Sequence, residues 1–219
     1  MRLGVISDIH ANRVALEAVL EAMPPVDDLV CAGDVVGYNP WPAECVAAVR
    51  ERSIPTVMGN HDRAVARDTG FRFNAQAKAG VEFAREELDD EAIAWLSDRP
   101  ESLTVADGRV TVVHGHPADP DRYTYPEEFS PRMLGDEDLL VTGHTHVQGH
   151  RTFDEGVVMN PGSVGQPRDG DPRAAYAVVD LDPLAVEERR VEYDVDAVAD
   201  AVEAAELPPG IGRRLYDGR

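Results

Sequence analysis

The stretch LGVISDIHANRVALEAVLEAMPPVDDLVCAGD, residues 3–34, sets the architecture. It opens with an apolar run that Asp8 stops, which is typical of a strand buried on both faces. Asn12 can cap a helix, because apolar residues recur behind it with a period of about 3.6 until two prolines end the pattern. A second apolar run follows at residues 29–32. Strand, helix and strand in this order predict a parallel pair with a right-handed crossover.

The same alternation continues on the carboxyl side of this unit. Residues 41–52 carry a helical pattern, residues 54–58 predict a third strand, and residues 75–88 and 90–97 predict further helices. Beyond these helices short apolar runs dominate, and the dipeptide Asp107-Gly108 predicts a two-residue hairpin turn. The further strands that we expect are 103–106, 109–114, 139–142, 147–153, 157–160, 174–180 and 185–193.

The two halves of the chain are expected to share one core. A late helical pattern covers residues 194–205, and neither a repeat nor a low-complexity linker separates the helix-rich half from the strand-rich half. Cores grow to about 250 residues before chains split, so we expect a single domain over residues 1–219. Alternating strands and helices place it in the α/β class.

Composition narrows the classes of partner and compartment. Asp and Glu number 41 against 21 Lys and Arg, for a formal net charge of −20. An extended nucleic-acid footprint needs basic side chains on the surface, so we expect none. Neither a membrane span of roughly 18 apolar residues nor a signal-peptide core is present, so we expect a cytoplasmic protein. The excess acid predicts a salt-loving, halophilic host, because molar salt screens such self-repulsion.

Polar clusters stand directly after five of the apolar runs. In open α/β sheets, ligands bind beyond the carboxyl ends of the strands, so these clusters can converge in one pocket. Their carboxylates, imidazoles and amide suit manganese, iron, zinc or cobalt. In extended backbone residues i and i+2 share a side, which points both members of Asp8-x-His10, and both of His144-x-His146, toward one ion. The clusters are Asp8-Ile9-His10, Gly33-Asp34, Gly59-Asn60-His61-Asp62, His114-Gly115-His116 and Gly143-His144-Thr145-His146.

These clusters, taken in order, resemble those of the calcineurin-like metallophosphoesterases. Longer strings at residues 7–12, 33–40 and 160–163 are similar to those of its small single-domain prokaryotic phosphodiesterases. The resemblance implies a four-layer αββα sandwich, in which two mixed sheets lie face to face with helices outside. It says little about residues 63–109 or about the carboxyl tail.

The resemblance also implies two divalent cations held by seven side chains. One ion would be held by Asp8, His10, Asp34 and His146. The other would be held by Asp34, Asn60, His114 and His144. Two cations about 3.5 to 4 Å apart repel each other, so a shared carboxylate is needed between them, and Asp34 supplies it. We expect Mn²⁺, with Fe, Zn, Co or Ni as alternatives.

The chemistry expected at such a pair is hydrolysis of a phosphate ester. Water on the two ions loses a proton near neutral pH, and the resulting hydroxide attacks phosphorus in line. By the same resemblance His61 stays unligated and assists the leaving group, while Asp62 orients it. We expect a small phosphate ester as substrate, above all a phosphodiester. The sequence leaves the oligomeric state open, a homo-oligomer included.

Two alternatives remain at this stage. One is a non-catalytic metal-binding scaffold on the same fold, which the complete ligand set disfavours. The other is a protein Ser/Thr phosphatase, which is disfavoured because residues 37–40 replace the Asp-Arg-Gly string of that class and Asp62 replaces its Glu. The native substrate, the metal and the role of His116 stay open. Arg168 and Arg173 are the candidates for phosphate clamps, although we expect both to be solvated surface charges.

Overall fold

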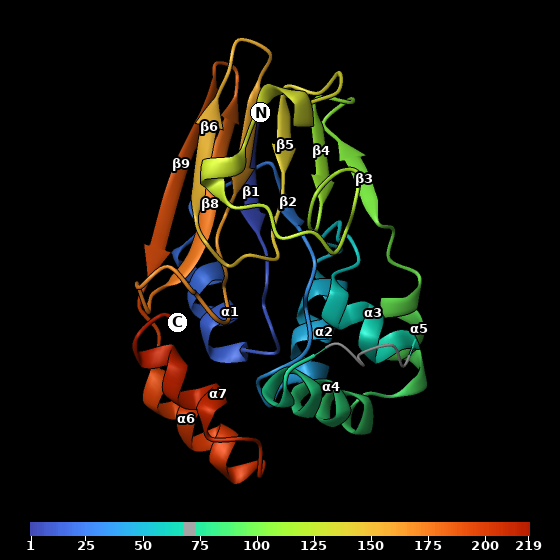
Figure 1. Cartoon of the computed structure of the whole chain (residues 1–219), viewed down its shortest axis with the longest axis vertical. Helices are drawn as coiled ribbons and strands as arrows, with labels where there is room; N and C mark the ends of the chain where they lie inside the picture. The colour runs from blue at the N-terminus through green and yellow to red at the C-terminus, as the bar shows by residue number, and fades with distance from the viewer. Residues whose placement is uncertain (68–72) are drawn as a thin grey trace.

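The computed structural model describes residues 1–67 and 73–219. Its strands form two sheets, ordered β2-β1-β8-β9 and β3-β4-β5-β7-β6 (Figure 1). The first sheet contains β1 (Arg2–Ile6), β2 (Asp28–Cys31), β8 (Ala174–Leu181) and β9 (Leu184–Val191). The second contains β3 (Ser102–Val105), β4 (Val110–Val113), β5 (Leu139–Val141), β6 (Gly149–Thr152) and β7 (Val157–Asn160).

Both sheets are mixed. In the first, β1 lies parallel to β2, with Val5 opposite Val30, and antiparallel to β8. In the second, β5 lies between β4 and β7 and is parallel to both. The β3–β4 hairpin turns at Asp107-Gly108, where φ is 55° and 91°. Positive φ at both central residues is what a type I′ turn requires, so the predicted hairpin is confirmed.

The two sheets face each other across an apolar layer. Leu3 and Val5 from the first sheet meet Val112, Val141 and Met159 from the second, and none of the five has exposed surface. Burying such a side chain stabilises the fold by roughly 1.5–3 kcal/mol relative to leaving it exposed. This layer therefore fixes the strand ends, from which the polar clusters emerge.

Helical layers cover the outer faces of the sheets. Five helices bury their apolar sides in one cluster with the outer face of the first sheet. They are α1 (Arg13–Ala22), α2 (Pro42–Glu51), α3 (Asn60–Arg67), α4 (Ala75–Glu87) and α5 (Asp90–Ser97). Two short 3-10 turns, η1 (Pro126–Glu128) and η2 (Pro131–Met133), cover the second sheet through Phe129 and Met133. The expected α/β sandwich of two mixed sheets flanked by helices is confirmed.

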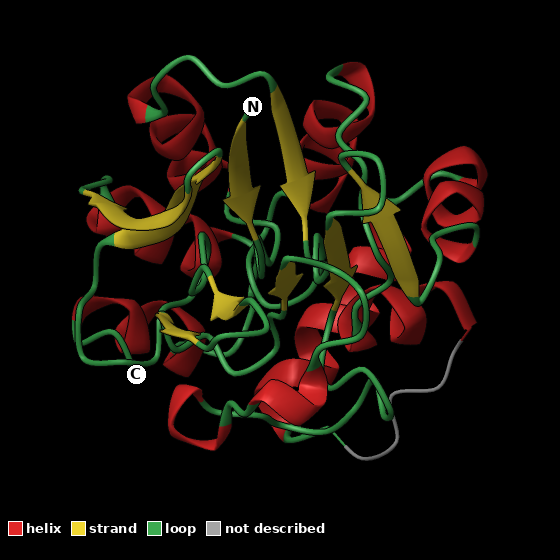
Figure 2. Ribbon diagram, turned by 90° about the horizontal axis from the view of Figure 1, so that it is seen from above, coloured by secondary structure: helices red, strands yellow, loops and turns green. Residues whose placement is uncertain are grey.

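The carboxyl end is helical: it holds the late helix predicted over residues 194–205, followed by a tail for which the sequence predicted no element. It forms α6 (Val195–Ala204), α7 (Gly210–Arg213) and η3 (Arg214–Tyr216). These elements bury Val198, Ile211 and Leu215 in a separate cluster with Tyr38. They lie at the opposite end of the molecule from the tips of the sheets (Figure 1), and seen from above the helices surround the strands (Figure 2).

One predicted strand is wrong, and the helix that follows it was not predicted. Residues 54–58 do not form a strand, because only Thr56 makes a single parallel bridge to Cys31. The Met58 N–H donates instead to the carbonyl of Pro100 at 2.7 Å, so the chain leaves the sheet edge there. It then begins α3 at Asn60, a helix that the sequence pattern missed.

Within the described residues, no helix combines the length and apolar character needed to cross a membrane.

Candidate metal centre

All seven predicted ligands lie at one edge of the two sheets. Asp8 and His10 follow β1, Asp34 follows β2, and Asn60 is the first residue of α3. The second sheet adds His114 after β4, and His144 and His146 after β5. Backbone hydrogen bonds link the loops, from the N–H of Asp8 to the carbonyl of Gly33 at 2.9 Å and from Gly143 to His114 at 2.7 Å. The convergence expected at the carboxyl ends of the strands is confirmed.

Backbone strain is concentrated in these loops. Asp8, His10, Asp34, His144 and His146 all have positive φ, between 48° and 68°. This left-handed conformation costs a non-glycine residue of order 1 kcal/mol or more and persists only where the surroundings enforce it. It also shows that these loops are not extended. The prediction that residues i and i+2 point toward one ion was therefore wrong for His144 and His146. Asp8 and His10 do share a half-site, whereas His144 and His146 belong to different ones.

Two glycines make room for this packing. A Cβ on Gly59 would lie 2.0 Å from Oδ1 of Asp34, and one on Gly143 would lie 2.2 Å from Oγ of Ser7. No side chain fits at these distances. The motif glycines therefore let neighbouring backbone approach the two carboxylates closely.

The first half-site consists of Asp8, His10 and His146, all of them buried. Oδ1 of Asp8 lies 3.8 Å from Nε2 of His10 and 3.4 Å from Nε2 of His146, and the two Nε2 atoms are 3.0 Å apart. Each ring is oriented through its Nδ1. That of His10 donates to the carbonyl of Val36 at 3.1 Å, and that of His146 donates to the carbonyl of Gln166 at 2.6 Å. Both Nε2 lone pairs therefore point at the same position as the Asp8 carboxylate.

The second half-site consists of Asn60, His114 and His144. Nδ1 of His114 donates to the carbonyl of Ala32 at 2.7 Å, while its Nε2 lies 3.1 Å from Oδ1 of Asn60. His144 has the opposite orientation, because its Nε2 donates to the carbonyl of Asp121 at 3.2 Å. Nδ1 is then the free donor atom of His144.

Asp34 stands between the half-sites. Its Oδ2 lies 3.6 Å from Nε2 of His10 in the first and 3.3 Å from Nε2 of His114 in the second. Its Oδ1 accepts a hydrogen bond from the N–H of His61 at 2.8 Å. One carboxylate oxygen thus faces both half-sites while the other is fixed by the start of α3.

These donors fit cations. Oδ1 of Asp8 is buried and makes no hydrogen bond to any described residue. His10 and His146 have committed their Nδ1 protons to backbone carbonyls, so two lone pairs face each other at 3.0 Å with no proton between them. A cation among these atoms turns the repulsion into coordination, and the nitrogen and oxygen donor set suits Mn, Fe, Zn or Co.

Burial keeps two of the imidazoles, those of His10 and His146, in the neutral state that metal ligands need, because it lowers the pKa of each well below its usual value. Burial opposes ionisation of Asp34, but the charges of His114 and His61 outweigh it and hold the Asp34 pKa well below its usual range. Burial also disfavours the His114 imidazolium, yet the charge of Asp34 raises its pKa to about 10. A proton on His114 thus occupies the position where a cation fits.

His61 lies beside His10 and Asp34, with which it forms a third group of possible metal ligands, and its ring packs in an aromatic cage. Its ring stacks on Phe73 with centroids 4.5 Å apart and contacts Tyr38 at 4.7 Å and His10 at 4.8 Å. Its Nδ1 is buried and unpartnered within the described part of the chain. Burial lowers the pKa of His61 to about 4, so the ring is neutral at pH 7.

Asp62 supports the loops through backbone contacts. Its carboxylate accepts hydrogen bonds from the N–H groups of Asp34 at 2.8 Å, Gly59 at 3.1 Å and Val36 at 3.2 Å. Burial, followed by the charge of Asp34, raises the pKa of Asp62 to about 7. Any orienting effect on His61 therefore passes through the start of α3, which these bonds hold.

Several residues outside the predicted set contribute. Ser163, in the turn after β7, donates to the carbonyl of Asp8 at 2.7 Å, which places this turn beside the centre. Tyr123 stacks on His144 with centroids 4.0 Å apart. The sequence carried no periodic signal for Tyr123, since it lies in an irregular loop. His116 makes a local bond from the Ala118 N–H at 3.0 Å and joins neither half-site.

Similarity to known proteins agrees with this geometry. The family model of the calcineurin-like phosphoesterase superfamily domain matches residues 1–183. An uncharacterized protein of Methanocaldococcus jannaschii is 31% identical over 99% of this chain and 98% of its own length. The phosphodiesterase YfcE of Escherichia coli K12 is 30% identical over 85% of this chain and 91% of its own. A metallophosphoesterase structure from Sphaerobacter thermophilus superposes with a TM-score of 0.87 at 36% identity, covering 100% of this chain and 99% of that one. The chain therefore belongs to the calcineurin-like phosphoesterase superfamily, a family of divalent-metal-dependent phosphoester hydrolases.

Proposed function

We propose that the protein is a phosphodiesterase that works with two divalent cations, Mn²⁺ being the expected metal. The observation that carries this proposal is the position of Asp34, whose Oδ2 faces Nε2 of His10 at 3.6 Å and Nε2 of His114 at 3.3 Å. A carboxylate between two nitrogen-rich half-sites is the arrangement that two neighbouring cations require. The similarity to YfcE supports a diester as the substrate.

The cations, when bound, supply a nucleophilic water near neutral pH and neutralise charge on the phosphate. The chain's own residues hold the site in the state that accepts them. His10 and His146 are kept neutral by burial and oriented by backbone carbonyls. Asp34 and Asp8 are the only carboxylates among the proposed ligands, so the loaded site is electropositive and attracts phosphate despite the acidic exterior.

His61 is proposed to act on the leaving oxygen. The ring is neutral at pH 7, because burial lowers its pKa to about 4. A neutral ring stabilises the leaving oxygen by donating an N–H hydrogen bond rather than by delivering an excess proton. Tyr38 and Phe73 hold the ring in place from two sides. Such a contribution is typically of order 10² to 10⁴ in rate.

The proposed substrate is a small phosphate ester. A formal charge of −20 repels extended polyanions, so we propose no broad nucleic-acid footprint. The competing class is a metal-binding scaffold without catalysis. The unpartnered Nδ1 of His61 beside the half-sites favours the enzyme, because a buried polar atom without a partner in the described part of the chain is free to contact a substrate.

Hydrolysis of bis-p-nitrophenyl phosphate tests the proposal. The protein is stripped with a chelator, reloaded with Mn²⁺ in molar KCl and compared on this diester and on p-nitrophenyl phosphate. We expect turnover that depends on the metal and is greater on the diester. His61→Ala should lower kcat by roughly 10² to 10⁴ while it binds metal like the parent. If the parent protein binds Mn²⁺ but hydrolyses neither compound, the scaffold is established instead.

A further inference from the structure

Arg168 lies at the rim of the metal centre without an acidic partner. Its Nε and one terminal nitrogen donate to Oε1 of Gln166 at 3.2 and 2.7 Å, and that nitrogen also donates to the hydroxyl of Tyr38 at 3.2 Å. Within residues 1–67 and 73–219 no Asp or Glu forms an ion pair with it. Arg173, five residues on, pairs with Asp171 at 2.6 Å instead. The expectation that both arginines are solvated surface charges is therefore wrong for Arg168.

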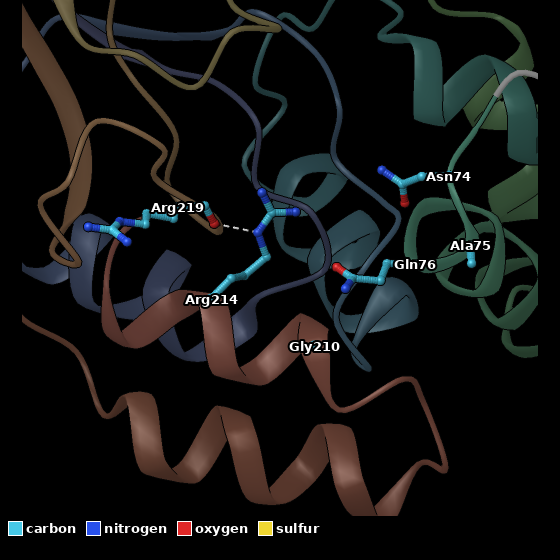
Figure 3. Close-up of a pocket in the computed structure, with 6 residues that line it drawn as sticks. All are labelled: Asn74, Ala75, Gln76, Gly210, Arg214 and Arg219. Carbon is cyan, nitrogen blue, oxygen red and sulfur yellow. Dashed lines mark hydrogen bonds between the residues drawn. The ribbon is translucent and has the colours of Figure 1, made fainter.

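A second guanidinium approaches the same tyrosine. The guanidinium carbons of Arg168 and Arg214 lie 5.7 and 6.0 Å from the ring centroid of Tyr38. Nε of Arg214 donates to the backbone oxygen of Arg219, and its terminal nitrogens make no hydrogen bond to the described residues. Arg214 also lines an open pocket of about 500 Å³ between the start of α4 and the end of the chain. In Figure 3 the Arg219 side chain turns away from the guanidinium of Arg214.

Hydrogen-bond donors outnumber acceptors around these two arginines. Nε2 of Gln166 is buried and unpartnered among the described residues, because the amide oxygen of that side chain serves Arg168. Burial and then the charge of Arg168 lower the pKa of Arg214, so the two cations destabilise each other. The half-exposed Tyr123 also lies near Arg168: burial raises the pKa of Tyr123, and the charge of Arg168 offsets only part of this rise. An anion at this position would satisfy the surplus donors and relieve the repulsion.

We propose that Arg168 and Arg214, with Tyr38 and Tyr123 beside them, form an anion subsite that receives a second phosphate of the substrate. The inference rests on the proposed function, because it places the scissile phosphate at the metal centre. Tyr38 contacts both guanidinia and, with ring centroids 4.7 Å apart, His61, so the subsite adjoins the residue proposed to act on the leaving oxygen. The second phosphate therefore lies on the leaving-group side. The substrate class is that of esters and anhydrides with a further phosphate next to the scissile one, such as nucleoside diphosphate derivatives.

Inhibition by ADP and AMP tests the subsite in the manganese-loaded protein. Each nucleotide is added as a competitor of bis-p-nitrophenyl phosphate, and the two differ by one phosphate. We expect ADP to inhibit roughly tenfold more strongly than AMP, as a charge-assisted contact to one further phosphate predicts. Arg168→Gln and Arg214→Gln should each reduce this ratio toward one, whereas Arg173→Gln, the matched control from the same loop, should preserve it. An equal effect of ADP and AMP on the parent, or a ratio unchanged in both variants, would overturn the proposal.

Calorimetric binding of ADP and AMP to the chelated protein separates this inference from the proposed function. If the parent hydrolyses neither ester when loaded, the proposed function fails, and binding still decides the subsite. The subsite predicts tighter binding of ADP that Arg168→Gln weakens and Arg173→Gln does not. If the parent is an active diesterase while ADP and AMP bind alike, the subsite fails and the proposed function stands.

Discussion

The two half-sites of the metal centre are built differently. In the first, Asp8, His10 and His146 are at most 2% exposed, and both rings are fixed by carbonyls of the buried residues Val36 and Gln166. In the second, His144 is held by the carbonyl of Asp121 in the irregular loop after β4. That loop also supplies Tyr123, which covers His144 and is itself 47% exposed.

The difference indicates that the first half-site is rigid and the second is more mobile. Strained, buried loops preorganise the first half-site before any metal arrives, so its cation should bind tightly. The second half-site depends on a surface loop, and loops of that kind open at low free-energy cost. We expect the second cation to bind more weakly and exchange faster. Three experiments test this description of the two half-sites and of the carboxylate between them.

Removing the shared carboxylate should have the largest effect. In Asp34→Asn, the amide can donate to Nε2 of His10 and His114, which satisfies the metal-free site but removes the charge that holds two cations together. We expect at least one ion to be lost and kcat to fall by roughly 10³ or more, since metal activation contributes several kcal/mol. Metal analysis after gel filtration and diester hydrolysis measure both. Full metal content with parental activity would contradict a shared carboxylate.

Removing one imidazole from each half-site compares them directly. We expect His146→Ala to lower the affinity for the tighter Mn²⁺ by at least roughly 100-fold, because a buried ligand position has no substitute. His144→Ala should weaken only the looser ion, by roughly tenfold, since solvent can reach that position through the Asp121 loop. Titration of each chelated variant with Mn²⁺, followed by electron paramagnetic resonance, gives both constants. Equal losses would show that the half-sites do not differ in rigidity.

The pH dependence of stability gives the smallest effect. The metal-free fold raises the pKa of His114 from 6.5 to about 10, mainly through Asp34, so the folded state holds a proton that the unfolded state releases above pH 6.5. The stabilisation is complete below that pH and is lost as pH rises toward 10. Between about pH 7 and pH 9 the metal-free protein should lose at most about 3 kcal/mol of unfolding free energy.

Urea denaturation at several pH values measures this loss. The manganese-loaded protein should lack it, because the cations replace the proton at His114, and His114→Gln should lack it in the metal-free form. A metal-free parent whose stability does not change over this range would contradict the assigned coupling between His114 and Asp34.

The clustering of these polar side chains could be predicted from sequence because they follow strand ends, whereas their assignment as metal ligands came from the resemblance to the family. An apolar run stopped by Asp8 or by Gly33-Asp34 marks a buried strand and the polar turn after it, and such turns gather at one sheet edge. The division of His144 and His146 between half-sites could not be predicted from alternation. Their positive φ values, which tertiary packing imposes, turn the two rings apart.

The surroundings of the ligands were less accessible to sequence reasoning. Residues 54–58 have the composition of a strand, yet Met58 bonds to Pro100 so that α3 can begin at Asn60. Asp62 bonds three backbone amides that come from two separate loops. Arg168 and Arg173 look alike in sequence, and only the fold shows that Asp171 neutralises Arg173 while Arg168 bonds to Tyr38, whose ring contacts His10.

Anomalous scattering from crystals grown with Mn²⁺ tests the central claim most directly. The account predicts two peaks about 3.5 to 4 Å apart, with Oδ2 of Asp34 between them, His10 and His146 at one peak and His114 and His144 at the other. A single peak, or two peaks neither of which touches the Asp34 carboxylate, would contradict it.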